Sequence, residues 1–194
     1  MNIGILGGTF SPPHMAHLWV AQQVLEDGWK DIDKVWLMPN TGSDCYGKGT
    51  KITATDRLDM CRKMIEDFSS PYIEVSDIEI INGLNYTYQL AEYLQAQYPN
   101  DKFYLIIGGD WEITKFKKWE KIVDVFCLIT VHRPGFNDKK RGVSDHQDIE
   151  FDLNSSIIRE RLLNGRTVRG LITPSVERYI LEKNLYKAGP NGKI

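Results

Sequence analysis

The residues best suited to chemistry stand in one stretch near the start of the chain, GGTFSPPHMAH at residues 7–17. An apolar run before it predicts a buried strand, and an apolar segment of helical period after it predicts a helix. A strand, a tight turn and a helix start together bind anions through backbone N–H groups and the helix dipole. His14 and His17 stand three residues apart in the first helical turn, so we expect both imidazoles to point the same way. Two histidines beside an anion site predict phosphate chemistry.

The glycines and histidines of this stretch also have simpler uses. Gly7 and Gly8 are expected to turn the backbone sharply and to let it approach a ligand closely, because they lack a side chain. Two histidines could instead be half of a zinc site, but structural zinc takes four ligands and catalytic zinc three, at recognisable spacing. No cysteine or histidine cluster elsewhere in the sequence supplies those ligands. The pattern therefore favours a phosphate site, with no metal held by protein side chains.

The same stretch resembles the signature of the nucleotidyltransferase superfamily, in which a His-x-Gly-His motif follows the first strand of a Rossmann-like fold. More narrowly, it is similar to the opening motif of nicotinate (or nicotinamide) mononucleotide adenylyltransferases. Ser11 stands where that family has an acidic or amide residue, and Ala16 where it has glycine. The resemblance implies that His14 and His17 are catalytic, with His17 the more important in the transition state. It also implies that four residues contact ATP: Gly7, Gly8, Thr9 and Phe10.

A second motif, YLIIGGD at residues 104–110, resembles the family's Ile-Ile-Gly-x-Asp. In doubly wound sheets, ligands bind beyond the carboxyl ends of the strands, where the strand order reverses. If the first and fourth strands are neighbours, this motif lies opposite residues 7–17. Asp110 could accept ribose hydroxyls there or simply cap the next helix, and the resemblance favours ribose. It implies ATP contacts for Gly108 and Asp110.

A third motif, NSSIIR at residues 154–159, resembles the family's Ser-Ser-Thr-x-Ile-Arg, which holds the ATP phosphates. Serines at a helix start leave hydroxyl and N–H groups for an anion, and an arginine one turn on can grip a phosphate with two parallel hydrogen bonds. A capped surface helix with a solvated arginine is the plain alternative. The resemblance implies that Ser155, Ser156 and Arg159 bind ATP.

The middle of the chain bears on the second substrate. Residues 83–88, GLNYTY, resemble a Gly-x-x-Tyr-Thr element, which implies that Tyr86 and Thr87 contact the acyl group of a pyridine ring. Lys118-Trp119 resembles a Lys/Arg-Trp pair whose indole stacks on that ring, a contact that suits an electron-poor ring. Trp119 could equally anchor a helix in the core. Two lysines of a long loop are candidates for the mononucleotide phosphate, Lys48 and Lys51.

Composition narrows the class of protein. The chain has 194 residues, 42% of them hydrophobic, which fits one core and one domain. A formal net charge of −2 argues against a nucleic-acid binder with a basic surface. The 3 cysteines are far apart and outside any Cys-x-x-Cys pattern, so we expect thiols in a reducing cytoplasm. We also expect no signal peptide and no membrane span.

Strand-like and helix-like segments alternate along the chain, which predicts a parallel sheet with helices on both faces. We expect strands at residues 3–6, 35–38, 72–75, 103–107 and 126–131. We expect helices at residues 18–25, 57–68, 88–98 and 119–125, and from near Ser155 and Thr173. The predicted fold class is α/β, a Rossmann-like doubly wound parallel sheet of nucleotidyltransferase type in one domain. Residues 137–148 are expected to form a loop and residues 187–194 a flexible tail.

The activity implied is adenylyl transfer from ATP, with Mg²⁺, to a pyridine mononucleotide, giving a dinucleotide and pyrophosphate. Backbone N–H groups near Tyr86 and Thr87 would favour nicotinate mononucleotide, whose carboxylate only accepts hydrogen bonds. Three alternatives stay open: nicotinamide mononucleotide as the main acceptor, a sister transferase of the phosphopantetheine or cytidylyl type, and a catalytically silent nucleotide sensor. The sequence leaves the oligomeric state open, a homo-oligomer included.

Overall fold

A computed structural model describes residues 1–26, 31–42, 52–108, 116–131, 146–147 and 153–186. Its strands are β1 (Asn2–Gly8), β2 (Lys34–Pro39), β3 (Ile73–Val75), β4 (Lys102–Gly108), β5 (Phe126–Val131) and β6 (His146–Gln147). Its helices are α1 (Met15–Glu26), α2 (Ala54–Phe68), α3 (Ile78–Asn82), α4 (Thr87–Gln97), α5 (Trp119–Val123), α6 (Ser155–Leu163) and α7 (Pro174–Glu182). The predicted alternation of strands and helices is confirmed.

The strands form one parallel sheet in the order β3-β2-β1-β4-β5-β6. β1 therefore lies between β2 and β4, with Leu6 opposite Leu37 on one side and Ile106 on the other. The chain builds outward from β1 in one direction and then returns to build from β4 in the other. The strand order thus reverses between β1 and β4, where a doubly wound sheet binds its ligands. The predicted adjacency of the first and fourth strands is confirmed.

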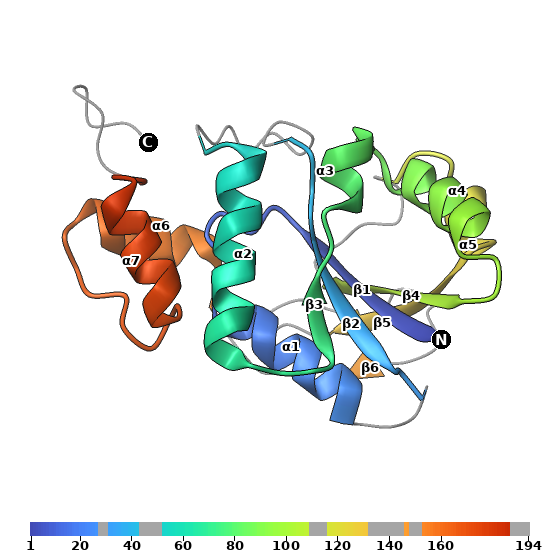
Figure 1. Ribbon diagram of the computed structural model, residues 1–194, viewed down its shortest axis with the longest axis horizontal. Coiled ribbons are helices and arrows are strands. Elements are labelled where there is room, and N and C mark those ends of the chain that lie inside the picture. The colour runs from blue at the N-terminus through green and yellow to red at the C-terminus, as the bar shows by residue number, and fades with distance from the viewer. Residues whose placement is uncertain (27–30, 43–51, 109–115, 132–145, 148–152, 187–194) are drawn as a thin grey trace.

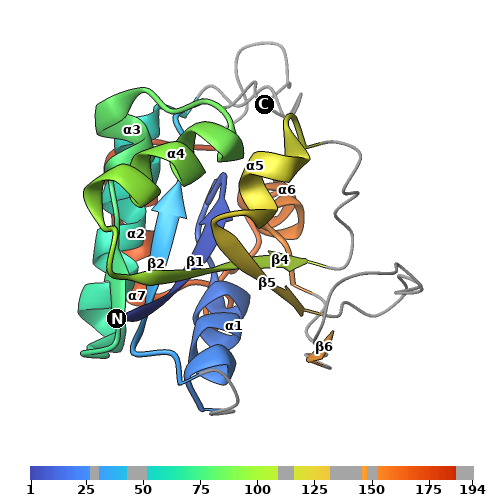
Figure 2. The same ribbon diagram turned by 90° about the vertical axis from the view of Figure 1, so that its right-hand side faces the viewer.

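Helices cover both faces of this sheet (Figures 1 and 2). One face carries the larger core, in which Leu18, Met60 and Val176 from α1, α2 and α7 pack together. On the other face, α4 and α5 pack Leu90, Leu94 and Ile122 against the strands. Because side chains alternate along a strand, β4 supplies residues to both cores. The two cores hold the sheet rigidly and so fix the carboxyl ends of its strands.

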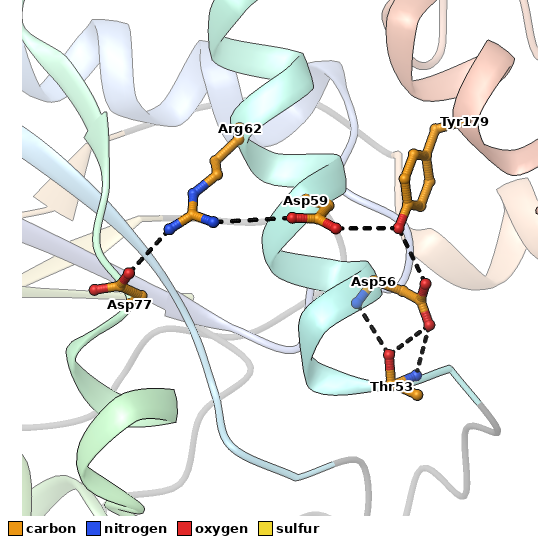
Figure 3. Close-up of polar contacts among 6 residues, drawn as sticks. All are labelled: Thr53, Asp56, Asp59, Arg62, Asp77 and Tyr179. Carbon is orange, nitrogen blue, oxygen red and sulfur yellow. Dashed lines mark hydrogen bonds and ion pairs between the residues drawn. The ribbon is translucent and has the colours of Figure 1, made fainter.

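Two helices far apart in the sequence, α2 and α7, are joined by polar contacts at both ends of their interface. Thr53 caps α2 with Asp56 in a capping box. The hydroxyl group of Tyr179 on α7 donates to Asp56 at 3.0 Å, and Asp59 lies 3.3 Å from it (Figure 3). At the other end, the Asp67 carboxylate accepts from the backbone N–H of Ser175 at 2.8 Å. The helix α7 is thereby fixed on α2.

Two elements were not predicted. The helix α3 has only five residues and buries none of them, so no apolar period marks it. The strand β6 lies inside the stretch 137–148 that we expected to be a loop. The rest of that stretch and the expected tail, residues 187–194, lie outside the described residues. In the described part of the chain, every helix is too short or too polar to cross a membrane.

Candidate active site

The two histidines meet at the start of α1, at the carboxyl edge of the sheet. His14 is buried and directly precedes the helix, whereas His17 lies in its first turn. Their rings are stacked, with centroids 3.7 Å apart. The backbone N–H of His14 donates to Nδ1 of His17 at 3.1 Å. An Nδ1 that accepts a hydrogen bond leaves the proton of a neutral imidazole on Nε2, so His17 presents an Nε2–H donor.

The turn between β1 and α1 differs in one respect from the expectation. The residue with left-handed backbone is Phe10, at φ 49°, rather than a glycine. Its ring is buried and lies 4.6 Å from the ring of His17, centroid to centroid. The packing of that ring holds the residue in a conformation that non-glycine residues rarely adopt. A Cβ atom on Gly7 would meet no atom within 4 Å, so space beside the backbone is open there.

A buried arginine, Arg57 on α2, binds the backbone of this turn and of the segment after β2. Its Nη1 donates to the carbonyl oxygen of Thr9 at 2.8 Å, and its Nη2 donates to the carbonyl oxygen of Asn40 at 2.8 Å. Asn40 follows β2, and its own N–H donates to the carbonyl oxygen of Gly8 at 3.0 Å. One cation therefore joins the ends of β1 and β2. The charge of Arg57 also adds positive potential behind a turn expected to face phosphates.

Glu79 on α3 is a carboxyl group close enough to Arg57 for the charge of Arg57 to affect its pKa. Burial raises the pKa of Glu79 to about 8, and the Arg57 charge offsets that rise only in part. Below this pKa the carboxyl group is protonated and neutral. The positive charge of Arg57 is therefore not cancelled by Glu79 at neutral pH.

The helix α6 also contacts the turn between β1 and α1. Nη1 of Arg159 donates to the carbonyl oxygen of Ser11 at 2.7 Å, and its Nη2 donates to Oγ of Ser156 at 2.9 Å. The expected neighbourhood of Arg159 and Ser156 is confirmed. Ser155 differs from the expectation, because its hydroxyl group donates to the carbonyl oxygen of Pro12 at 2.9 Å. The cap of α6 is Asn154, whose side chain accepts from the N–H of Ile157. In this conformation Ser155 ties the loop to α6.

Of the proposed mononucleotide residues, Tyr86, Thr87 and Trp119 lie on the other face of the sheet, where α4 and α5 begin side by side. Nζ of Lys117 lies 4.0 Å from the ring centroid of Tyr86, and Nζ of Lys118 lies 4.2 Å from that of Tyr88. Trp119 begins α5 and packs against Phe116, ring centroids 5.4 Å apart. Trp119 is also half-buried against the second core, which fits its use as a helix anchor, and its stacking on a pyridine ring stays a prediction. These contacts bring the start of α4 and the start of α5 together, and the binding of a mononucleotide by Tyr86, Thr87 and Trp119 stays a prediction.

A hydrogen bond connects the segment before α4 to the segment after β2. Oγ1 of Thr41, just after β2, donates to Oδ1 of Asn85 at 2.8 Å. Gly108 ends β4 beside the switch point. Three residues of the sequence prediction lie outside the described residues: Lys48, Lys51 and Asp110.

The sequence reading missed three charged or polar residues of this region, Arg57, Lys117 and Tyr186. An arginine or lysine on a helix face normally indicates a solvated surface, and Arg57 shows no deviation from that pattern in the sequence. Lys117 stands next to the Lys118-Trp119 pair and was readable as part of it. Tyr186, whose hydroxyl group lies 3.1 Å from Oγ of Ser11, stands 175 residues away in the sequence. Only the fold brings Tyr186 to the turn.

This edge of the sheet offers two kinds of binding surface. The turn after β1 and the start of α6 supply hydrogen-bond donors and positive charge, and the starts of α4 and α5 supply aromatic rings beside lysines. Arg159 and the His17 Nε2–H suit anionic oxygens. Tyr86, Trp119 and the two lysines suit a flat ring that carries an acidic group. No side chain is placed as a nucleophile activated by a neighbouring base among the described residues. The arrangement fits transfer between two bound phosphate compounds.

Comparisons with known proteins agree with this chemistry. The cytidylyltransferase-like family model matches residues 5–161. The Bacillus subtilis nicotinate-nucleotide adenylyltransferase is 32% identical, over 96% of this chain and 99% of that protein. A protein of Oceanobacillus iheyensis with the name "probable nicotinate-nucleotide adenylyltransferase" is 38% identical, over 98% of this chain and 99% of its own length.

A solved structure shows the same fold. The Plasmodium falciparum nicotinic acid mononucleotide adenylyltransferase complexed with NaAD superposes with a TM-score of 0.76 at 24% identity. The match covers 95% of this chain and 97% of that one. Family model, full-length relatives and fold thus agree that this chain belongs to the nicotinate-nucleotide adenylyltransferase family of the cytidylyltransferase-like nucleotidyltransferases.

Proposed function

We propose that this protein transfers the adenylyl group of ATP to the phosphate of nicotinate mononucleotide, a step of NAD biosynthesis. A phosphate oxygen of the mononucleotide forms a bond to the α-phosphorus of ATP. The bond from that phosphorus to the oxygen bridging to the β-phosphorus breaks, and its electron pair leaves with pyrophosphate. The acceptor is already an anion, so the protein needs only to position the substrates and stabilise charge.

One observation carries the proposal: two different kinds of binding surface flank the same switch point of the sheet. On the phosphate side, His14, His17 and Arg159 surround the turn after β1. On the acceptor side, Tyr86 and Trp119 stand with Lys117. The relatives named above support the assignment of these two sides to ATP and to a nicotinate nucleotide.

Within this proposal each described residue has a task. The Nε2–H of His17 donates to an oxygen of the transferred phosphoryl group, where charge accumulates in the transition state. Arg159, Ser156 and the turn that carries Gly7, Gly8, Thr9 and Phe10 hold the remaining phosphates of ATP. Trp119 stacks on the pyridine ring, and Tyr86 with Thr87 contacts its acyl group. Gly108 and Asp110 serve the ribose of ATP, and Lys48 or Lys51 the mononucleotide phosphate.

We further propose that Mg²⁺ enters bound to ATP. The described residues gather no group of three or more His, Cys, Asp or Glu side chains. Mg²⁺ in nucleotide-binding sites is commonly held mainly by phosphate oxygens and water, so it needs no such group of protein side chains. When bound, the ion neutralises charge on the phosphates. The use of ATP and the widely spaced cysteines also favour a cytoplasmic location.

A direct test supplies the purified protein with ATP and Mg²⁺ and, in separate tubes, nicotinate mononucleotide, nicotinamide mononucleotide or phosphopantetheine. Pyrophosphate release and the mass of the product are measured. We expect release with the pyridine mononucleotides, with a higher kcat/KM for the nicotinate form. Release with phosphopantetheine alone would assign a sister transferase. ATP binding without release in any tube would assign a nucleotide sensor.

A further inference from the structure

We propose that Tyr186 is a positioning residue for ATP, which sets the geometry of Arg159 by way of Ser11. This inference rests on the proposed function, because it takes Arg159 to bind the ATP phosphates. Tyr186 stands after α7, far along the chain from the turn that begins at Gly7. The last described part of the chain would thus take part in building the nucleotide site.

The contact that carries the proposal lies inside the protein. The side chain of Tyr186 is 3% exposed, and its hydroxyl oxygen lies 3.1 Å from Oγ of Ser11. Ser11 is also buried. Burial raises the pKa of Tyr186, so its hydroxyl group stays protonated and able to hydrogen-bond. A buried pair of hydroxyl groups fixes two segments that are otherwise separate in the sequence.

The next link of the chain of contacts joins Ser11 to Arg159. The carbonyl oxygen of Ser11 accepts from Nη1 of Arg159 at 2.7 Å. The other end of the guanidinium is fixed by Ser156 at 2.9 Å. A guanidinium has five N–H donors in a rigid fork, so its direction is set once two of them are placed. Displacement of Ser11 therefore turns the donors that face the nucleotide.

The backbone around Tyr186 is itself held in an uncommon conformation. Asn184 has φ 53° and Tyr186 has φ 58°, both in the left-handed region. Between them, the N–H of Leu185 donates to the carbonyl oxygen of Ile180 at 2.9 Å, which closes the end of α7. Left-handed non-glycine residues cost free energy and persist where the surroundings over-determine them. Here they direct the Tyr186 ring back into the larger core, toward Ser11.

The base from which Tyr186 acts is rigid. Asp67 binds the first turn of α7 through Ser175, and Tyr179 reaches Asp56 on α2. The helix α7 therefore cannot shift without breaking contacts to α2. The two tyrosines of this region thus have different partners. Tyr179 contacts Asp56 on α2, and Tyr186 contacts Ser11 in the turn between β1 and α1. This difference supplies a matched control.

The experiment compares Tyr186→Phe with Tyr179→Phe, each lacking one hydroxyl group. The primary measurement is the Kd for ATP by calorimetry without acceptor, followed by KM for both substrates and kcat. For Tyr186→Phe we expect ATP Kd and KM to rise about three- to tenfold, as for one lost hydrogen bond. The KM for the mononucleotide and kcat should stay within about twofold. Tyr179→Phe should lower the melting temperature and leave the Kd for ATP at the wild-type value.

Two further variants make the route of action testable. Ser11→Ala removes the same hydrogen bond from its other end and should give the same change in ATP Kd, even if Tyr186→Phe folds poorly. In the Arg159→Lys background, Tyr186→Phe should add little, because the planar fork it orients is already gone. An unchanged ATP Kd in Tyr186→Phe and Ser11→Ala, or fully additive effects with Arg159→Lys, would overturn the inference. Failure of the proposed function is seen separately, as wild-type protein that binds ATP and releases no pyrophosphate.

Discussion

In the proposed function His17 is the residue on which catalysis depends most, and a hydrogen bond to its ring is the basis for that role. The N–H of His14 occupies Nδ1 of His17, so the neutral ring has its proton on Nε2. The stacked ring of His14 and the tilted ring of Phe10 restrict the imidazole on two sides. A donor held in place before the reaction needs no reorganisation when negative charge develops. The departure at Ala16 leaves this pair assembled.

A comparison of Gly7 with Gly8 distinguishes a glycine proposed to be needed for ligand binding from one needed for folding. A Cβ atom at Gly7 would meet no atom of the protein within 4 Å, whereas one at Gly8 would lie 3.1 Å from the ring of Phe10. Gly7→Ala should therefore fold with nearly the wild-type melting temperature and raise KM for ATP about tenfold, because the added methyl group occupies the approach of a phosphate.

Gly8→Ala should instead lower the melting temperature, since the Phe10 ring has to move. Thermal unfolding and ATP kinetics of the two variants distinguish the outcomes. A Gly7→Ala protein with unchanged KM for ATP would mean that ATP does not approach the end of β1.

Among the elements, α4 and α5 are the ones that we propose select the acceptor. Both helices begin at the same place, where the Tyr86–Lys117 and Tyr88–Lys118 contacts form a wall. The contact with Tyr86 raises the pKa of Lys117, so this lysine is charged at neutral pH. In the proposed function, a cation beside the start of α4 adds to the preference for a carboxylate that we expect from the backbone N–H groups there.

Lys117→Ala should accordingly reduce the ratio of kcat/KM for nicotinate over nicotinamide mononucleotide, by roughly threefold for an exposed charge. Trp119→Ala should weaken both acceptors equally, because stacking depends on the ring and not on its substituent. Lys121→Ala is the control, since Lys121 forms an ion pair with Glu92. The measurement is a competition between the two mononucleotides in one tube. A ratio that falls in Lys121→Ala as much as in Lys117→Ala would argue against the assignment.

The sequence predicted the elements with buried apolar residues and missed two short ones, α3 and β6. Apolar periodicity reports burial, so α2 and β4, which bury many residues, were placed within a few residues of their ends. The helix α3 buries none of its five residues and left no such signal. The motifs gave His17, Arg159 and Trp119, because those residues recur at fixed spacing in a known family.

What supports those residues was not readable from the sequence. Arg57 lies on a helix like any solvated arginine, yet it is fully buried and binds the carbonyl oxygen of Thr9. The residue with left-handed backbone in the turn is Phe10, whereas the sequence led us to expect the sharp turn at Gly7 and Gly8. Both facts depend on contacts between segments that only the fold brings together. Sequence reasoning therefore located the site and missed the residues that hold it.

At the scale of the whole molecule, the protein has a half-buried carboxyl group, Glu79, whose titration the charge of Arg57 affects. The pKa of Glu79 is raised to about 8 in the folded protein, against an ordinary value near 4.3 for an unfolded chain. The folded state thus keeps a proton that the unfolded state has already lost over this range. The contribution of Glu79 to stability is therefore fully present below about pH 4.3, falls as pH rises toward about 8, and levels off above it.

Glu79→Gln should therefore be more stable than the wild type at pH 9, on the order of a few kcal/mol, and close to it at pH 4.5. Urea unfolding of both proteins at the two pH values measures the difference. Glu66→Gln removes an exposed carboxylate from α2 and serves as the control. A Glu79→Gln protein with the same stability difference at both pH values would show that this carboxyl group titrates normally.

The most direct test of the account follows the α-phosphate of ATP in wild-type protein and in His17→Ala. ATP labelled at the α-phosphorus is mixed with Mg²⁺ and nicotinate mononucleotide, and the label is traced in a single turnover. The account predicts that the label enters the dinucleotide, that pyrophosphate is unlabelled, and that His17→Ala lowers kcat on the order of 10²-fold with an unchanged Kd for the mononucleotide. Label absent from the dinucleotide, or near-wild-type turnover in His17→Ala, would contradict it.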